Sequence, residues 1–178
     1  IVDLESDGFE EIPVPSEGRS KPGELWVYGP QVMKGYLNNP EATAETLVDG
    51  WLRTGDVAEL DEHGNVYIVD RFKELIKYKG YQVPPAELES VLLSHPDIAD
   101  AACSGVIRSD GEEIPKAYVV LKAGKQVTED EIMDYVADRV APYKKVRVVE
   151  FLEEIPKSAT GKILRKDLKA MELARAQS

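Results

Sequence analysis

The sequence has little of two residue types that build cross-links and metal sites: it contains one cysteine and two histidines in 178 residues. The single thiol, Cys103, cannot form an internal disulfide, and His63 and His95 cannot by themselves supply the ligand cluster of a structural metal site. We therefore expect a protein of a reducing, cytoplasmic compartment that holds no metal through its own side chains.

Long hydrophobic runs are also missing. No run reaches the roughly 18 apolar residues of a membrane-spanning helix, and the opening IVDLESDGFEE is acidic where a signal peptide would be basic and then apolar. We expect no membrane partner. The chain does not begin with methionine, so we expect a fragment that lacks an upstream portion. It ends in ARAQS rather than Ser-Lys-Leu, which gives no support for a peroxisomal address.

Positive charge is scarce in the first part of the sequence. Residues 1–70 contain 4 Lys and Arg against 15 Asp and Glu, whereas residues 71–178 contain 18 of each. The net charge of −11 argues against general binding to nucleic acids. The change in composition near Asp70 and Arg71 predicts a domain boundary there, and a hydrophobic content of 43% is sufficient for packed cores.

The first seventy residues are expected to be β-rich with one helix. The runs GELWVYG and GNVYIVD are short, apolar or alternating, and bounded by glycine, which is typical of strands. Between them, NPEATAETLVDG has a proline near its first turn, early glutamates and a terminal glycine, a pattern that favours a short helix.

Residues 71–178 predict a small α+β domain with the order β-β-α-β-β-α-β-α. Its second helix-forming segment opens with a capping box, Thr128 to Glu131, and repeats apolar residues at helical spacing. Taken in order, the segments are KELIKYKGYQV, a strand pair turning at Lys79-Gly80, then PPAELESVLLSH, DAACSGVI, KAYVVLK, TEDEIMDYVADRV, VRVVEFL and LRKDLKAMEL.

The segment WLRTGD presents Asp56 at a Thr-Gly turn. A carboxylate in such a place can accept hydrogen bonds from both hydroxyls of a ribose. The alternative is an aspartate that bonds to the backbone of its own turn, and composition alone favours this alternative.

The segment DRFKELIKYKGYQV holds Arg71, Lys73, Lys77 and Lys79 at odd positions. In a continuous strand these four would share one face and suit phosphates or carboxylates. An exposed edge strand also uses lysines to prevent aggregation, and without further information this second interpretation is the better one.

The segment PKSATGKILRKD has a Gly-Lys pair in a small polar loop just before a predicted helix. A Walker phosphate loop is excluded, because Pro156 stands where it needs glycine and Ile163 where it needs Ser or Thr. Lys157 and Lys162 lie near the positive end of the helix dipole, where cations are unfavourable, so a bound anion is expected. A Gly35-Tyr36 pair earlier in the chain indicates only a turn.

Taken together and in their order along the chain, these motifs identify a family far more specifically than any single motif does. The series MKGYLNNPEATAETL, DGWLRTGD, GNVYIVDRFKELIKYKGYQV, PAELESVL, HPDIADAA and IPKSATGKILRKDL closely resembles the C-terminal portion of the adenylate-forming enzymes, over nearly the whole chain. These are acyl- and aryl-CoA synthetases, adenylation domains of peptide synthetases, and beetle luciferases. IKYKGYQV and IPKSATGKILRKDL look most like 4-coumarate–CoA ligases and their luciferase relatives.

The resemblance implies that residues 1–70 are the β-rich end of a large N-terminal domain and residues 71–178 a mobile C-terminal lid. Such an enzyme activates a carboxylic acid with ATP and Mg²⁺ and passes the acyl group to coenzyme A. The family's phosphate loop and acyl pocket are not found here, so we expect the missing N-terminal domain to bind most of the ATP and the metal, and the fragment alone to be inactive. The alternatives are a luciferase-like monooxygenase acting on an adenylated luciferin and a stand-alone interaction module.

The resemblance also implies roles for individual residues in nucleotide binding and catalysis. Asp56 matches the residue that holds the ribose hydroxyls, and Arg71 matches a second nucleotide contact. Lys162 matches the catalytic lysine that bridges the substrate carboxylate and the α-phosphate. Lys73 occupies the hinge position about which the lid turns, and it is also expected near the acyl-adenylate.

A second group of positions belongs to the strand pair. Lys77, expected to be catalytic, and Gln82 match residues near the acyl-adenylate. Lys79 and Gly80 match a stretch that lines the coenzyme A tunnel.

Overall fold

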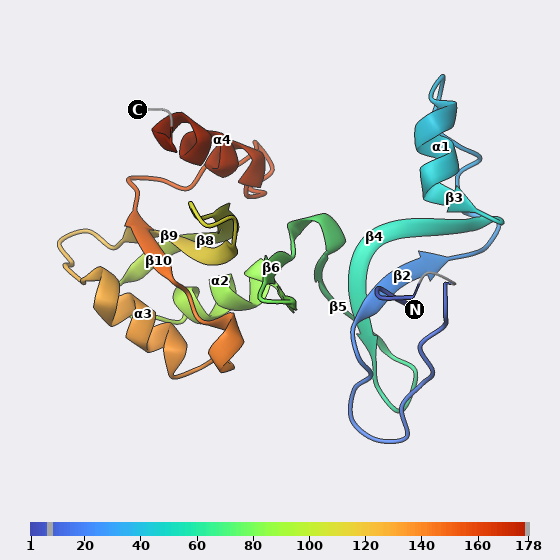
Figure 1. Ribbon diagram of the computed structural model, residues 1–178, viewed down its shortest axis with the longest axis horizontal. Coiled ribbons are helices and arrows are strands. Elements are labelled where there is room, and N and C mark those ends of the chain that lie inside the picture. The colour runs from blue at the N-terminus through green and yellow to red at the C-terminus, as the bar shows by residue number, and fades with distance from the viewer. Residues whose placement is uncertain (7–8, 177–178) are drawn as a thin grey trace. The chain divides into compact units, whose positions relative to one another are not determined.

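The computed structural model describes residues 1–6 and 9–176, which form two compact units, Ile1–Lys73 and Glu74–Ser178 (Figure 1). The division falls just after the change in charge composition at Asp70 and Arg71. No helix in the described ranges is long and apolar enough to cross a membrane.

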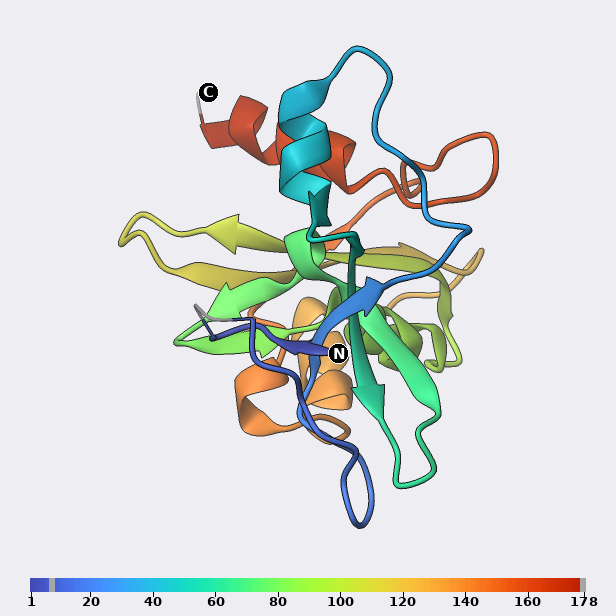
Figure 2. The ribbon, with the colours of Figure 1, turned by 90° about the vertical axis from the view of Figure 1, so that its right-hand side faces the viewer.

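The first unit is an antiparallel sheet with the strand order β1-β2-β4-β3, and β5 pairs with β4 outside this path. The long, bent strand β4 dominates this unit in Figures 1 and 2. The elements are β1 (Val2–Asp3), β2 (Gly23–Val27), α1 (Pro40–Thr46), β3 (Leu47–Val48), β4 (Trp51–Leu60) and β5 (Val66–Arg71).

Local hydrogen bonds define the turns of the first unit. The Asn39 side chain caps α1 by accepting the Ala42 N–H at 3.0 Å, and Pro40 fits the first helical position. In the β4–β5 turn, the Asp61 carboxylate accepts hydrogen bonds from the His63 and Asn65 backbones, the Asn65 amide and the Tyr67 hydroxyl. These bonds, the Asn65 amide first, lower the pKa of Asp61 to about 2.

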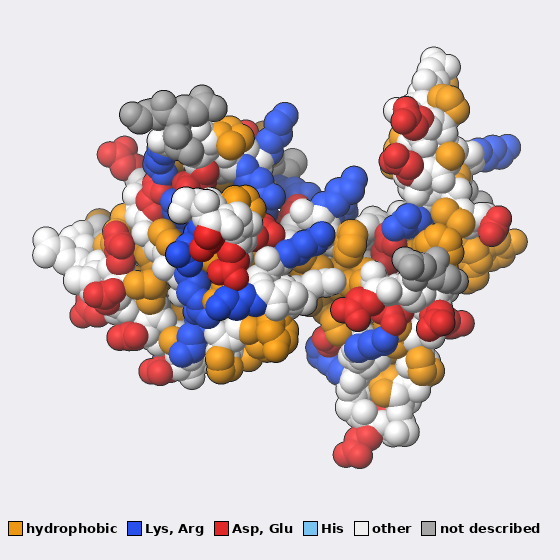
Figure 3. Space-filling model, in the orientation of Figure 1, with side chains coloured by type: hydrophobic (Ala, Val, Ile, Leu, Met, Phe, Trp, Pro, Cys, Tyr) orange, Lys and Arg blue, Asp and Glu red, His pale blue; other side chains and the backbone are white. Residues whose placement is uncertain are grey.

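The first unit has a thin core. Within residues 1–6 and 9–73, the buried hydrophobic residues are Ile12, Val57 and Ala58. Large side chains such as Leu37 and Tyr28 stay at the surface, where Figure 3 shows hydrophobic side chains gathered beside acidic ones. The sheet therefore exposes apolar surface of the kind that folded domains usually cover.

The second unit has a three-stranded sheet in the order β10-β9-β8, with β8 and β9 antiparallel and β10 parallel to β9. A separate hairpin, β6–β7, precedes it. The elements are η1 (Phe72–Glu74, which crosses the unit boundary), β6 (Ile76–Tyr78), β7 (Tyr81–Val83), α2 (Pro85–Leu93), β8 (Ile98–Ile107), β9 (Glu113–Leu121), α3 (Glu129–Ala137), η2 (Pro142–Lys144), β10 (Val148–Phe151) and α4 (Arg165–Ala176).

Helices cover both faces of this sheet because its strands are apolar on both sides. Alternate residues of β8 and β9, such as Cys103 and Val119, pack with α2 and α3 in the main core. The residues between them, such as Ala102 and Tyr118, pack with Leu168 of α4 on the other face. Figure 1 accordingly shows α4 across the sheet from α2 and α3.

The α+β class is confirmed, and the order of strands and helices in the second unit is the one that the sequence predicts. The capping box at α3 is present: the Thr128 hydroxyl accepts the Glu131 N–H at 3.2 Å, and the Glu131 carboxylate accepts the Thr128 N–H at 2.8 Å. The condition for a single cationic face is not met. Residues 71–79 do not form a continuous strand, because the 3₁₀ turn Phe72–Glu74 interrupts it.

Candidate functional site

Asp56 and Arg71 are direct neighbours on the antiparallel strands β4 and β5. Arg71 Nε lies 2.9 Å from Asp56 Oδ1, and the side chains are 55% and 27% exposed. Within the Thr-Gly turn, the Asp56 N–H donates to the Thr54 hydroxyl at 3.0 Å, so the acceptor of this bond is Thr54 and not the Asp56 carboxylate. An exposed ion pair of this kind adds at most about 1 kcal/mol to stability, so both groups remain accessible to a polar ligand.

The 3₁₀ turn η1 carries Lys73, the last residue of the first unit. Its side chain is exposed, and no carboxylate in the described part of the chain forms an ion pair with it. Glu74, the next residue, begins the second unit and forms an ion pair with Arg165. The predicted hinge position thus coincides with the point where the two units divide.

The β6–β7 hairpin brings four of the predicted residues together. Lys77 lies opposite Gln82 in the register, and the two-residue turn between the strands is Lys79-Gly80. Both turn residues have positive φ, 49° and 81°, which is the type I′ pattern that glycine favours at its second position. Strand alternation buries Ile76, Tyr78 and Val83, so the polar pair of Lys77 and Gln82 faces outward.

Two polar contacts of the first strand join this hairpin to the rest of the second unit. The Lys77 N–H donates to Glu113 Oε2 of β9 at 3.0 Å. Arg147 Nε donates to the Tyr78 hydroxyl at 3.4 Å, and this hydrogen bond is the main cause of a lowered pKa for Tyr78. The second strand is held as well, because Val83 is buried in the main core and Tyr81 stacks on Tyr143, while the turn remains exposed.

Residues 157–163 form a tight loop, called the lysine loop below, closed by a bridge between Lys157 and Ile163. The Gly161 N–H donates to the Ser158 carbonyl at 2.8 Å, and the Ser158 hydroxyl accepts the Lys162 N–H at 3.1 Å. Gly161 has φ = 82°, so a residue with a side chain would be strained there. The loop is ordered by its own backbone bonds and presents Lys162 at the surface.

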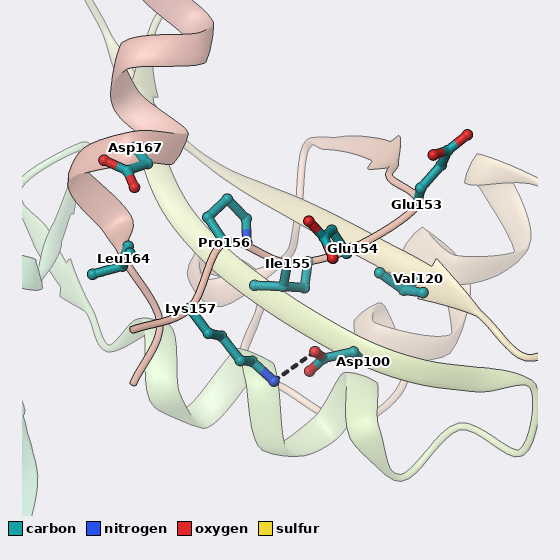
Figure 4. A pocket seen from close by; sticks show the side chains of 9 residues that line it. All are labelled: Asp100, Val120, Glu153, Glu154, Ile155, Pro156, Lys157, Leu164 and Asp167. Atoms are coloured by element: carbon teal, nitrogen blue, oxygen red, sulfur yellow. Dashed lines mark hydrogen bonds and ion pairs between the residues drawn. The ribbon is translucent and has the colours of Figure 1, made fainter. Parts of the chain in front are cut away.

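The two lysines of this loop differ in their partners. Lys157 Nζ lies 2.5 Å from Asp100 Oδ2, beside an open hollow of about 510 Å³ that Glu153 and Asp167 also line (Figure 4). Within residues 1–6 and 9–176, no carboxylate pairs with Lys162. Of the two lysines that were expected to bind an anion, only Lys162 is available for one, because acidic groups already surround Lys157.

The lysine loop and the turn of the β6–β7 hairpin lie on different sides of the second unit (Figure 2). The loop is anchored at β8 through Asp100, whereas the hairpin is anchored at β9 through Glu113. The structure therefore groups Lys77, Gln82 and the turn residues in one place and Lys162 in another.

A buried charge cluster formed by Glu74, Glu89 and Arg165 was not expected from the sequence. Arg165 is the first residue of α4, and its guanidinium contacts both carboxylates. One sequence signal does mark it, since a cation at a helix N-terminus is unfavourable unless an anion lies nearby. Cys103 lies beneath this cluster, and burial raises the pKa of its thiol well above the usual range.

Comparison with known proteins identifies the second unit. The profile of the AMP-binding enzyme C-terminal domain matches residues 87–162. The chain is 54% identical over 166 residues to 4-coumarate–CoA ligase-like 4 of Oryza sativa subsp. japonica, covering 93% of this chain and 29% of that protein. It is 56% identical over 152 residues to peroxisomal OPC-8:0-CoA ligase 1 of Arabidopsis thaliana, covering 85% and 28%. The chain thus spans less than a third of the length of these curated relatives.

Solved structures of longer proteins contain the same fold. The o-succinylbenzoate CoA synthetase of Bacillus subtilis, in complex with an acyl-adenylate intermediate, is 40% identical, with a TM-score of 0.79 over 95% of this chain and 33% of that one. The amide bond synthetase McbA from Marinactinospora thermotolerans is 34% identical, with a TM-score of 0.81 over 96% and 34%. The second unit therefore carries the AMP-binding enzyme C-terminal domain, and the chain is similar to 4-coumarate–CoA ligase-like proteins and to part of solved adenylate-forming enzymes.

Proposed function

We propose that the chain is part of an ATP-dependent acyl- or aryl-CoA ligase, which converts a carboxylic acid to an acyl-adenylate and then to a coenzyme A thioester. The observation that carries this proposal is the contrast within the lysine loop: Lys157 is neutralised by Asp100, whereas Lys162 projects from a tight loop with no carboxylate partner in the described residues. The similarity to relatives named as CoA ligases supports the same reaction class.

Within this proposal, the first unit is the end of a larger nucleotide-binding domain and the second unit is the lid. The exposed apolar surface of the first unit supports the first assignment, because folded domains usually bury such a surface against another part of the protein. The described residues contain no group of three His, Cys, Asp or Glu side chains that could hold a metal ion. As the resemblance implies, we assign Mg²⁺ and most of the ATP contacts to residues outside this chain, and we expect the chain alone not to turn over ATP.

Lys162 has the chemistry that adenylation requires. When a carboxylate attacks the α-phosphorus of ATP, two anions approach each other, and an ammonium on a flexible stem neutralises both as charge moves in the transition state. Bringing the ammonium in on a lid also excludes water from the reactive anhydride.

Asp56 and Arg71 would hold the nucleotide. The Asp56 carboxylate can accept two hydrogen bonds from a ribose diol, and the neighbouring guanidinium, already 2.9 Å away, keeps the carboxylate ionised and oriented. Because both side chains are partly exposed, a nucleotide can reach them without opening the sheet.

The β6–β7 hairpin would serve the second half-reaction. Lys77 and Gln82 would contact the acyl-adenylate, and the exposed Lys79-Gly80 turn would line the path of the coenzyme A thiol. The hairpin and the lysine loop lie on different sides of the unit, so one orientation of the lid need not present both. Rotation about Lys73, where the units divide, would exchange one for the other.

The test compares Lys162→Ala with Lys157→Ala in the complete enzyme. We expect Lys162→Ala to slow adenylation by about 10²- to 10³-fold, the usual cost of losing one electrostatic contact to a transition state. The same variant should still convert a supplied acyl-adenylate to thioester. Lys157→Ala should leave both steps nearly unchanged, because Lys157 is occupied by Asp100. Equal loss of both half-reactions in Lys162→Ala would contradict the proposal.

A luciferase-like oxygenase would use the same adenylate and the same lysine, so light emission from the complete enzyme with a luciferin would distinguish it. A stand-alone interaction module is less well supported, since it gives no reason for a free Lys162 beside a paired Lys157.

A further inference from the structure

We propose that Arg165 is a positioning residue that ties the lysine loop to the hinge end of the second unit through Glu74 and Glu89, so that Lys162 moves with the unit as one body. This inference rests on the proposed function, because it concerns how the adenylation lysine is delivered.

The Arg165 guanidinium is held from three directions. Nη1 lies 2.7 Å from Glu74 Oε2. Nη2 donates to both oxygens of Glu89, at 2.7 and 2.8 Å. Nε donates to the Cys103 carbonyl of β8 at 3.3 Å. One side chain therefore joins α4 to η1, α2 and the central sheet.

The cluster is largely removed from water, which makes its contacts specific. The Arg165 side chain is 14% exposed, and those of Glu89 and Glu74 are 10% and 25% exposed. Glu89 Oε1 also accepts the Cys103 N–H at 2.9 Å, so the buried carboxylate has several donors. A buried ion pair contributes little net stability, but removing one partner leaves an uncompensated charge and is strongly unfavourable.

The position of the cluster along the chain gives it a role beyond packing. Arg165 follows Lys162 closely in the sequence. The backbone between them is fixed by a hydrogen bond from the Leu164 N–H to the Pro156 carbonyl at 2.8 Å. At the other end, Glu74 directly follows Lys73, the last residue of the first unit. Arg165 thus connects the base of the lysine loop to the first residue beyond the hinge.

The loop would survive loss of this connection but would be poorly placed. Its internal hydrogen bonds around Ser158 and Gly161 do not involve Arg165, and Lys157 stays paired with Asp100. Lys162 would then remain on an ordered loop that is still held at Lys157 but can shift at its Arg165 end. A displacement of about 1 Å at a reacting group costs on the order of 10²-fold in rate.

The test uses two variants of the complete enzyme, Glu74→Gln and Arg165→Met, with Arg175→Met as a matched control. Glu74→Gln cuts the hinge contact while the buried Arg165–Glu89 pair stays. Arg175 lies on the same helix but pairs with Glu150 and Glu172, away from the loop. Adenylation is measured as acid-dependent pyrophosphate exchange, transfer as thioester formation from a supplied acyl-adenylate, and folding as the thermal midpoint.

We expect Glu74→Gln to slow adenylation by about 10-fold and Arg165→Met by about 10²-fold, with transfer within about threefold of the wild type in Glu74→Gln. Arg175→Met should change neither step. Parallel loss of both steps together with a lower thermal midpoint in Glu74→Gln would show a merely structural role and overturn the inference, as would an unchanged adenylation rate. If Arg165→Met does not fold, Glu74→Gln decides alone.

The parallel Lys162→Ala variant separates this inference from the proposed function. If Lys162→Ala loses adenylation and Glu74→Gln does not, only the positioning role fails. If Lys162→Ala keeps adenylation, the proposed function of the loop fails, and the positioning role fails with it.

Discussion

The two units of the chain differ sharply in how much apolar surface they bury. Among the described residues, three buried hydrophobic side chains support the first unit, whereas twenty lie in the second. The first unit also leaves large side chains at the surface, such as Leu37 at 91% exposure and Tyr28 at 66%. Burial of apolar area is the main favourable term in folding, so the second unit carries its own source of stability and the first does not.

The comparison shows that secondary structure alone does not make a domain. The first unit has well-formed strands and turns with satisfied hydrogen bonds, but few of its described apolar side chains are buried. The second unit has helices on both faces of its sheet and two buried clusters. The units should therefore respond differently when they are separated, truncated or titrated.

Separating the units should give the largest effect. We expect residues 74–178 alone to unfold in one cooperative transition, because the buried clusters lie within this segment. We expect residues 1–73 alone to show no cooperative transition, since three buried apolar residues cannot offset the loss of chain entropy. Circular dichroism melts of the two pieces provide the measurement, and a cooperative melt of residues 1–73 would remove the contrast between the units.

A pair of neighbouring leucines on α2 tests the source of the second unit's stability. Leu92 is fully buried, and Leu93 is 50% exposed. We expect Leu92→Ala to lower the free energy of unfolding of this unit by about 2–5 kcal/mol through lost burial and a cavity. We expect Leu93→Ala to change it by only about 0.5 kcal/mol, as for most surface substitutions.

Chemical denaturation of residues 74–178 measures both leucine variants on the same transition. Similar losses for Leu92→Ala and Leu93→Ala would mean that α2 is held by something other than its buried face.

The smallest expected effect lies in the first unit, at the Asp61 turn. The pKa of Asp61 is lowered from 3.8 to about 2, so its carboxylate stabilises the folded turn above pH 3.8, and this contribution is lost as the pH falls through about 2. We expect Asp61→Asn to weaken the turn at pH 7 and to have no effect near pH 2.

A carbon-13 titration of the Asp61 carboxyl in the whole chain checks this directly. A midpoint near 2 is expected, and a midpoint near the ordinary value of 3.8 would show that the turn bonds do not stabilise the charged form.

The features that the sequence predicts well are local. The Thr128 capping box and the buried face of α3, with Ile132 and Val136, follow from spacing within one helix. The Lys79-Gly80 turn likewise follows from a two-residue loop between apolar runs. Such patterns depend on neighbours a few positions away, which a single sequence displays.

The features that the sequence does not predict depend on distant partners. Lys157 and Lys162 look alike in one loop, and only Asp100, 57 positions earlier, distinguishes them. The Arg165 cluster joins Glu89, 76 positions away, and no local pattern pairs these residues. The single-face cationic row, which the sequence left as the less favoured interpretation, does not form, because a 3₁₀ turn at Phe72–Glu74 separates Arg71 from the strand of Lys77.

The buried position of Cys103 makes its thiol a natural probe of local opening in the second unit. The thiol is fully buried, and its backbone N–H and carbonyl are both engaged by the Arg165 cluster, through Glu89 and through the guanidinium. Because the sequence contains no other cysteine, an alkylating reagent added to the native chain labels a single site, and only in molecules whose α2 or α3 has transiently opened. The labelling rate therefore reports the free energy of that sub-global opening without any engineered tag.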